Sequence, residues 1–326
     1  MSTPFYEGAV AYEGADPGDP IFYPDDDPHF WIGKPGLMMV ELPSLGADNY
    51  TATAAAGEVE QPLMGGGSGI DRFASQTRRW TLAWPSIGGR DLQTVMALAS
   101  WDLLGPPPWV YLGPEDNNRL TRVQSLCGAR DGDVSGWLSS DGDVDFEPSV
   151  APRVFPGGVM AWAPGSSGAI LAAGADGDTA GNPDVDHAAP VLPGMPATPI
   201  FWARCSTGTA TLKARLSGRL ADGTIDTEAD GPDVDLDDTE WLPLYVTAEA
   251  GTLGASQYLV PELVCVTAGD VLVCNPDLRY TDLPGDFELG GGAPRVAGPF
   301  DYARPVDVHR WSPIGLTLAE TITGAL

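Results

Sequence analysis

Apolar and polar residues alternate most clearly between Ser75 and Ile87. Trp80, Leu82 and Trp84 occupy every second position, and Arg79, Thr81 and Ala83 stand between them. A period of two is typical of a strand with one buried face. The pattern therefore predicts a half-buried strand here.

The segment after this strand has the period of a helix instead. Leu92, Val95, Met96 and Ala99 fall at positions i, i+3, i+4 and i+7 and form one apolar stripe. The run Gly105-Pro106-Pro107-Pro108 follows and cannot continue a helix. We expect one amphipathic helix that ends before Gly105 and packs its stripe on the strand with Trp80.

Most other periodic segments are short and separated by turn-forming residues, including 41 Gly and 31 Pro. Strands are predicted at 109–112, 120–126, 200–205, 210–216, 241–248, 258–266, 271–274, 305–311 and 316–322. The fold class is therefore mainly β, with a β-sandwich or jelly roll in the second half.

Composition shifts along the chain suggest four regions. Residues 1–36 are an irregular arm rich in Pro, Asp and aromatics, and 37–150 form a first β domain with the helix. Residues 151–284 form the jelly-roll domain, and 285–326 form a C-terminal extension whose strands leave open a return to the first domain.

Charge excludes one class of ligand. The chain has 17 basic and 45 acidic residues, for a net charge of −28. Such an excess of carboxylates repels phosphate, so we expect that the chain does not bind duplex DNA. No apolar run is long enough to span a membrane, and the N-terminus lacks the features of a signal peptide. We expect synthesis in the cytoplasm and no membrane insertion.

Catalytic and cofactor motifs are missing from the sequence. It contains no nucleophile elbow, phosphate-binding loop, zinc-protease motif or dinucleotide fingerprint. His29, His187 and His309 lie in different regions without metal-ligand spacing. We predict no enzyme and no cofactor, although two of the many carboxylates could still form a glycosidase pair that the sequence does not distinguish.

One acidic near-repeat resembles the start of a calcium loop. Asp131 and Asp133 in the first copy, and Asp141 and Asp143 in the second, have the spacing of the first oxygen ligands. Gly142 occupies the position that needs a bidentate Glu. These four residues are calcium candidates, but solvated Asp-Gly hairpin turns are the preferred interpretation.

The four cysteines are too dispersed for a disulfide scaffold. Cys265 and Cys274 flank Gly269-Asp270 symmetrically, so a tight turn there would place them opposite each other across a hairpin. A disulfide between them is conceivable, but we expect all four thiols to be reduced and buried.

The segment 69–126 combines the Arg-rich Trp/Leu strand, the amphipathic helix and the aromatic strand Trp109-Val110-Tyr111-Leu112. This order resembles the tail-tube-like domain of distal tail and minor tail proteins of long-tailed (siphovirus-like) bacteriophages. The cues Ala268-Gly269-Asp270-Val271 and Asn275-Pro276-Asp277 resemble the galactose-binding-like jelly roll that many of these proteins carry. The segment 315–320 is similar to their terminal strand.

The resemblance implies a structural virion protein of the tail tip. Copies would form a ring, usually a hexamer in that family, that joins the tail tube to baseplate proteins in the virion tail. DNA would pass through without specific binding. The tail-tube-like domain would be a β-sandwich with one flanking helix, and Arg78, Arg79 and Arg90 would lie at the ring interface, because guanidinium groups pair well with carboxylates.

An alternative function is binding of a host-surface glycan by the jelly roll. Exposed aromatics such as Trp202, Trp241 or Tyr258 would stack on sugar rings. Core packing remains the simpler role for each, because all three lie in strand-like segments.

Overall fold

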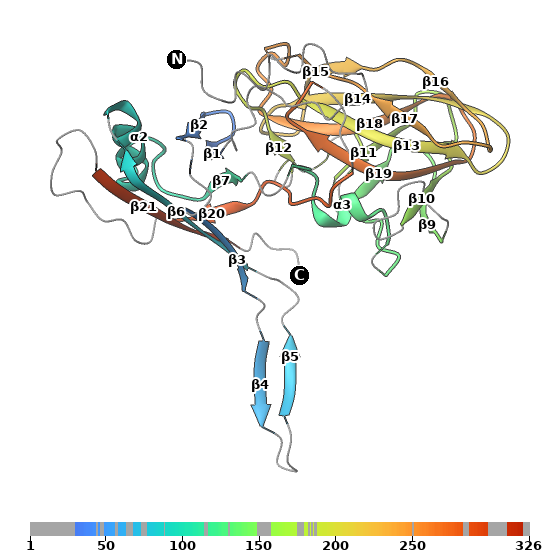
Figure 1. Cartoon of the computed structure of the whole chain (residues 1–326). Helices are drawn as coiled ribbons and strands as arrows, with labels where there is room; N and C mark the ends of the chain where they lie inside the picture. The colour runs from blue at the N-terminus through green and yellow to red at the C-terminus, as the bar shows by residue number, and fades with distance from the viewer. Residues whose placement is uncertain are drawn as a thin grey trace, which may run out of the picture.

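The computed structural model describes residues 30–43, 45, 49–55, 58–62, 68–72, 77–87, 89–113, 117–129, 131–148, 158–174, 179–181, 183, 185, 188–249, 251–282, 287–298 and 312–321. These residues form two β-rich parts that lie next to each other, with a narrow hairpin projecting from one of them (Figure 1). The prediction of a mainly β protein is confirmed.

The first part is a seven-stranded antiparallel sheet, called sheet I, in the order β2-β1-β7-β20-β21-β6-β3. Its strands are β1 (Phe30–Lys34), β2 (Met38–Leu42), β3 (Tyr50–Ala55), β6 (Thr77–Ile87), β7 (Trp109–Leu112), β20 (Arg295–Ala297) and β21 (Ser312–Glu320). Helix α2 (Gly89–Ala99) is the predicted amphipathic helix.

The core of this part follows the sequence pattern. Trp80 and Leu82 on β6 are fully buried and pack in one cluster with Leu316 on β21. Leu92 and Val95 of α2 join the same cluster, so the helix stripe faces the sheet. Burial of these large side chains supplies the hydrophobic stabilisation of this part.

Strands β4 (Glu58–Pro62) and β5 (Ser68–Arg72) pair only with each other among the described strands. They lie in the chain between β3 and β6, which are neighbours in sheet I. Figure 1 shows this hairpin extending away from both larger parts.

The second part is a β-sandwich of two sheets. Sheet II has the order β17-β13-β19-β10-β9, and sheet III has the order β15-β14-β18-β11-β8, with β12 pairing to β18 and β16 to β14. The strands are β8 (Trp137–Ser139), β9 (Val144–Glu147), β10 (Val159–Trp162), β11 (Ile170–Ala173), β12 (Ala189–Pro190), β13 (Thr198–Cys205), β14 (Ala210–Arg219), β15 (Ile225–Asp230), β16 (Val234–Leu236), β17 (Leu242–Tyr245), β18 (Tyr258–Thr267) and β19 (Val271–Arg279).

Alternate residues of the two sheets fill the sandwich core. Phe201 and Val273 point inward from sheet II, and Leu212 and Leu263 point inward from sheet III. Their neighbours along each strand therefore face outward, because successive side chains of a strand point to opposite faces. One of these outward faces is the outer face of sheet II.

The strand predicted at 120–126 is wrong. Residues Arg122–Leu126 form the short helix α3, which begins with a capping box between Thr121 and Gln124. Gln124 N donates to Thr121 Oγ1 (3.3 Å), and Thr121 N donates to Gln124 Oε1 (2.8 Å). These two bonds satisfy backbone donors that a helix start otherwise leaves open, so the local capping outweighs the strand-like apolar pattern.

The hairpin considered around Gly269-Asp270 does not form. Strand β18 belongs to sheet III and β19 to sheet II, so the chain crosses between sheets at this turn. Cys265 lies in the sandwich core, while Cys274 packs on the outer face of sheet II. All four cysteines are buried and free, as expected from their dispersal. Burial raises the pKa of the Cys265 and Cys274 thiols.

The predicted boundaries at 36 and 150 need correction. Strand β1 lies before residue 37 and pairs with β7 inside sheet I. Strands β8 and β9 lie before residue 150 but belong to the sandwich. Composition could not show this, because the sandwich is inserted between β7 and β20, two adjacent strands of sheet I.

At the junction, Asn118 holds the incoming and outgoing chains together. Its Nδ2 donates to Glu288 O (2.9 Å) and Pro276 O (3.2 Å), and its Oδ1 accepts from Leu120 N (3.0 Å) and Leu278 N (3.2 Å). An apolar cluster of Trp31, Val110, Leu112 and Leu192 also joins sheet I to the sandwich.

The predicted strand at 305–311 lies outside the described residues.

Candidate functional site

The outer face of sheet II carries a row of aromatic and proline side chains. Trp202 on β13 lies opposite Pro243 on β17, and Tyr245 lies two residues beyond Pro243 on the same face. Residues directly opposite in an antiparallel pair share a face. Tyr245 is 43% exposed, Pro243 is exposed, and Trp202 is partly buried.

Trp241 extends this row. It packs in the same outer-face cluster as Trp202, just before β17 begins. The guanidinium carbon of Arg204 lies 5.2 Å from the centre of the Trp241 ring. This distance is that of a cation–π contact, which holds the charge against the ring. We call Trp202, Arg204, Trp241, Pro243 and Tyr245 the aromatic platform.

Buried apolar side chains lie beside the platform. Arg204 lies opposite Leu272, and Trp202 lies opposite Cys274, both on β19. Leu272, Cys274 and Val159 pack in one cluster with Trp202 and Trp241 and are at most 5% exposed. These buried side chains pack against Trp202 and Trp241 and hold the two rings in position.

The far edge of the same face is acidic. Ala161 on β10 lies opposite both Leu272 and Asp145, and Val159 lies opposite Glu147. Asp145 and Glu147 are exposed on β9. The exposed parts of this face are thus the aromatic edge and the acidic edge, and the apolar centre between them is buried. The aromatic edge is the part that offers apolar surface to a ligand.

The structure brings together Trp202 and Trp241, two of the three predicted stacking residues. Tyr258 does not join them, because it lies on β18 in sheet III, opposite Arg219 and Pro190, and is only 8% exposed. Sequence reasoning missed Arg204 and Tyr245. The alternation of Trp202 and Arg204 along one strand was a usable signal, whereas the position of Tyr245 depends on the pairing of β13 with β17.

The predicted interface arginines lie in different settings. Arg78 is partly buried and pairs with Glu320 within the chain. It also donates from Nη2 to Gly291 O (2.9 Å) and lies over the Trp80 ring. Arg79 on β6 and Arg90 on α2 are exposed. The Arg78 side chain therefore makes its contacts within sheet I and with Gly291. Of the three predicted interface residues, Arg79 and Arg90 remain accessible to a partner.

The calcium candidates do not come together as a ligand cage. Asp133 Oδ1 accepts from Ser135 N (3.0 Å) and Ser135 Oγ (2.6 Å), as in a solvated turn. Asp141 Oδ2 accepts from Ser166 Oγ (2.6 Å), and Asp131 and Asp143 are exposed. Within the described ranges, no group of three or more His, Cys, Asp or Glu could hold a metal ion. His29, His187 and His309 lie outside those ranges.

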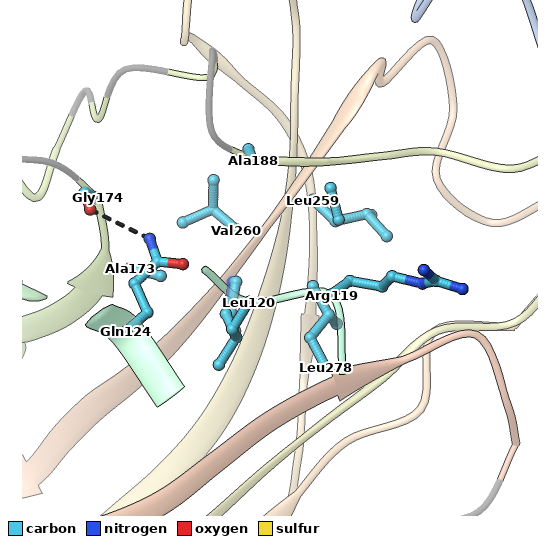
Figure 2. Close-up of a pocket in the computed structure, with 11 residues that line it drawn as sticks. Arg119, Leu120, Gln124, Ala173, Gly174, Ala188, Leu259, Val260 and Leu278 are labelled. Carbon is cyan, nitrogen blue, oxygen red and sulfur yellow. Dashed lines mark hydrogen bonds between the residues drawn. The ribbon is translucent and has the colours of Figure 1, made fainter. Parts of the chain in front are cut away.

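A narrow pocket lies between α3 and sheet III, and its polar groups are already engaged (Figure 2). Gln124 Nε2 donates to Gly174 O (3.1 Å), and its Oε1 belongs to the capping box. Arg119 points away from the pocket and donates to Gly113 O (3.1 Å). The remaining lining is mostly apolar, so this pocket is a packing seam between α3 and the sandwich.

Neither described helix is long and apolar enough to cross a membrane. No protein-family model matches the chain, and no curated protein matches it in sequence.

Some solved structures are similar. The xylan-binding domain CBM22-1 of Paenibacillus barcinonensis Xyn10C is 14% identical with a TM-score of 0.35, covering 48% of this chain and 92% of that domain. The enzymatically active domain of bacteriophage CBA120 tailspike protein 4 is 14% identical with a TM-score of 0.34, covering 50% of this chain and 21% of that one. A cyclase from Fischerella sp. TAU is 13% identical with a TM-score of 0.33, and the match covers 45% of this chain and 87% of the cyclase chain.

Proposed function

We propose that the sandwich binds carbohydrate on the aromatic platform of sheet II. The observation that carries this proposal is the alignment of Trp202, Pro243 and Tyr245 on one outer face, with Trp241 beside them. Aromatic rings offer broad apolar surfaces with polar edges, and these match the C–H faces of sugar rings. Tyr245 is exposed and the two tryptophans are partly buried, so each ring keeps some surface that a ligand could contact.

Direct binding measurements on the full chain test this proposal. A panel of plant, bacterial-wall and capsular polysaccharides would be screened by affinity electrophoresis, and hits would be measured by calorimetry. We expect Tyr245→Ala and Trp241→Ala to weaken binding at least tenfold, because each removes a stacking surface. Ile225→Ala is the matched control, since Ile225 is also exposed (44%) but lies on β15 of the other sheet.

Two results would overturn the proposal. One is a wild-type chain that binds no member of the panel. The other is binding that survives the loss of both Tyr245 and Trp241, because the ligand would then occupy another surface.

A second candidate function is assembly into a ring at a bacteriophage tail tip, between the tail tube and the baseplate. The observation that favours it is the β4–β5 hairpin, which extends from β3 and β6 away from both larger parts (Figure 1). An isolated two-stranded hairpin is marginally stable in water, and its unpaired edges can pair with another chain. A neighbouring copy would supply the missing contacts, and the net charge of −28 would let DNA pass without being bound.

Mass photometry and negative-stain electron microscopy of the purified chain test assembly. We expect a closed oligomer with a central hole, and a monomer when residues 58–72 are replaced by a short Gly-Ser linker. A wild-type chain that stays monomeric at micromolar concentration would refute a ring formed by this chain alone. An oligomer unaffected by the deletion would exclude the hairpin as its contact.

A further inference from the structure

Arg204 differs from the other arginines of the described sandwich strands because it has no carboxylate partner among the described residues. Arg215 pairs with Asp230 and Glu228, Arg219 with Glu262, and Arg279 with Asp277. Arg204 makes one hydrogen bond within the described chain, from Nη1 to Asp238 O, and its length of 3.4 Å makes it weak. In a protein with 45 acidic residues, an unpaired guanidinium on a candidate binding face requires an explanation.

The unused part of Arg204 is the edge formed by Nε and Nη2. Arg215 and Arg279 use this edge for carboxylates, whereas in Arg219 Nη2 donates to Glu262 and Nε to Ser217 Oγ. In Arg215, Nε and Nη2 lie 2.6 and 3.3 Å from the two Asp230 oxygens, and in Arg279 they lie 2.8 and 2.6 Å from Asp277 Oδ2. Two parallel N–H groups on one edge match the two oxygens of a carboxylate. In Arg204, Nε is buried without a hydrogen-bond partner among the described residues.

The side chains around Arg204 offer its Nε no good hydrogen-bond acceptor. Its neighbours on the face are the Trp241 ring and the apolar side chain of Leu272, neither of which accepts a strong hydrogen bond. A buried donor without an acceptor is destabilising, because it has lost its hydrogen bonds to water. Arg204 is held by the Trp241 ring and one weak hydrogen bond, so a bound group would have to draw the buried Nε and Nη2 edge toward it.

We infer that the aromatic platform takes a sugar that carries a carboxylate, and that Arg204 is the residue that selects it. This inference rests on the proposed carbohydrate binding. The sugar ring would lie on the aromatic side chains, and its carboxylate would accept hydrogen bonds from the free edge of Arg204. Uronic and sialic acids share this chemistry, and the two arms of the experiment distinguish them.

The acidity of the chain does not oppose such a ligand at this position. Asp145 lies on the same face as Arg204, three strands away at about 14 Å, beyond the screening length of about 8 Å at physiological ionic strength. Asp237, near the Arg204 bond to Asp238 O, already accepts hydrogen bonds from Thr239 N (2.8 Å) and Thr239 Oγ1 (2.6 Å). A ligand carboxylate within hydrogen-bond distance of Arg204 would contact a guanidinium that no described carboxylate pairs with.

The test uses the full chain and matched sugars that differ only in charge. One arm compares galacturonic acid oligosaccharides with their methyl esters, and the other compares sialyllactose with its carboxyl methyl ester. We expect the acidic member of at least one pair to bind at least tenfold more tightly, and this preference to shrink as NaCl rises. We expect Arg204→Gln to remove the preference while leaving binding of the neutral member within about twofold.

Arg204→Lys separates geometry from charge, because it keeps the charge but lacks the two-donor edge. We expect it to recover less than half of the preference in free energy. Neutral sugars that bind through Tyr245 without any acid preference in the wild type would overturn this inference and leave the proposed function standing. Failure to bind any sugar, neutral or acidic, would overturn both. If Arg204→Gln does not fold, the wild-type preference for the acidic sugar and its salt dependence still test whether the platform selects a carboxylate.

Discussion

The Arg78 guanidinium on β6 holds the Glu320 carboxylate on β21 through two hydrogen bonds, from Nε and Nη2, each 3.2 Å long. The Arg78 backbone N–H adds a third bond to Glu320 Oε2 at 2.9 Å. The two residues are 242 positions apart in the chain. The pair therefore helps to fix the C-terminal strand in sheet I after the chain has passed through the sandwich.

Removal of this pair should destabilise sheet I. Hydrogen bonds to charged groups contribute about 1.5–3 kcal/mol, and partial exposure of this pair to solvent weakens it. We therefore expect Arg78→Ala and Glu320→Ala each to cost about 1–2 kcal/mol of unfolding free energy. The double variant should cost less than the sum of the two, since both substitutions remove the same interaction. Denaturant unfolding of the full chain measures these values.

Arg79→Ala is the matched control, because Arg79 is the next residue on β6 and is exposed. It should change stability by less than about 0.5 kcal/mol. Equal costs for the Arg78 and Arg79 variants would contradict a specific role for the ion pair.

Leu92→Ala should lower the unfolding free energy by about 2–5 kcal/mol. Leu92 is 4% exposed and packs with Val95, Trp80 and Leu82 in the core of sheet I, so truncation leaves a cavity. Gln93→Ala on the exposed side of α2 should leave stability nearly unchanged. A loss under about 1 kcal/mol for Leu92→Ala would place the helix outside the core.

Glu262→Gln should destabilise the sandwich strongly. Arg219 and Glu262 are both fully buried, with Nη2 2.6 Å from Oε1, and Ser217 Oγ also donates to Oε1. Without the carboxylate, the buried guanidinium charge is left unneutralised, at an expected cost of about 3–5 kcal/mol. Glu228→Gln, at the more exposed pair with Arg215, should cost less than about 1 kcal/mol. Similar losses in the two variants would argue against the buried pair.

Thr239→Val should raise the pKa of Asp237. The Thr239 hydroxyl and backbone N–H donate to Asp237 and hold its carboxyl pKa below the usual value. A carboxylate with a lowered folded-state pKa stabilises the protein above the unfolded-state pKa, and this contribution is lost as pH falls through the folded-state value. NMR titration of the side-chain carboxyl carbon measures the change.

The turn at Asp222 provides the internal control for that titration. Thr224 donates to Asp222 in the same way and lowers its pKa too. Asp222 should keep its low pKa in Thr239→Val, and Asp237 should keep its own in Thr224→Val. A parallel shift of both carboxyl groups in either variant would indicate a global change rather than loss of one hydrogen bond.

Local patterns in the sequence were sufficient for the elements that depend on near neighbours. Trp80, Leu82 and Trp84 at every second position predicted β6, and the stripe of Leu92, Val95 and Met96 predicted α2. These elements were predictable because the period of apolar residues directly selects which backbone conformation buries them together. The mainly β class followed in the same way, from many short apolar runs separated by Gly and Pro.

The partners of each strand depended on contacts that no local pattern encodes. The turn after β18 has the same residues whether the chain pairs with itself or crosses to the other sheet, so the sequence could not show that Cys265 and Cys274 lie in different sheets. Tyr258 and Trp202 both lie in apolar strands, yet they belong to opposite sheets. The platform exists because Tyr245 pairs with Ile200 on β13, 45 residues earlier in the chain. Only the tertiary packing of the sandwich decides that pairing and which side chains lie on its outer face.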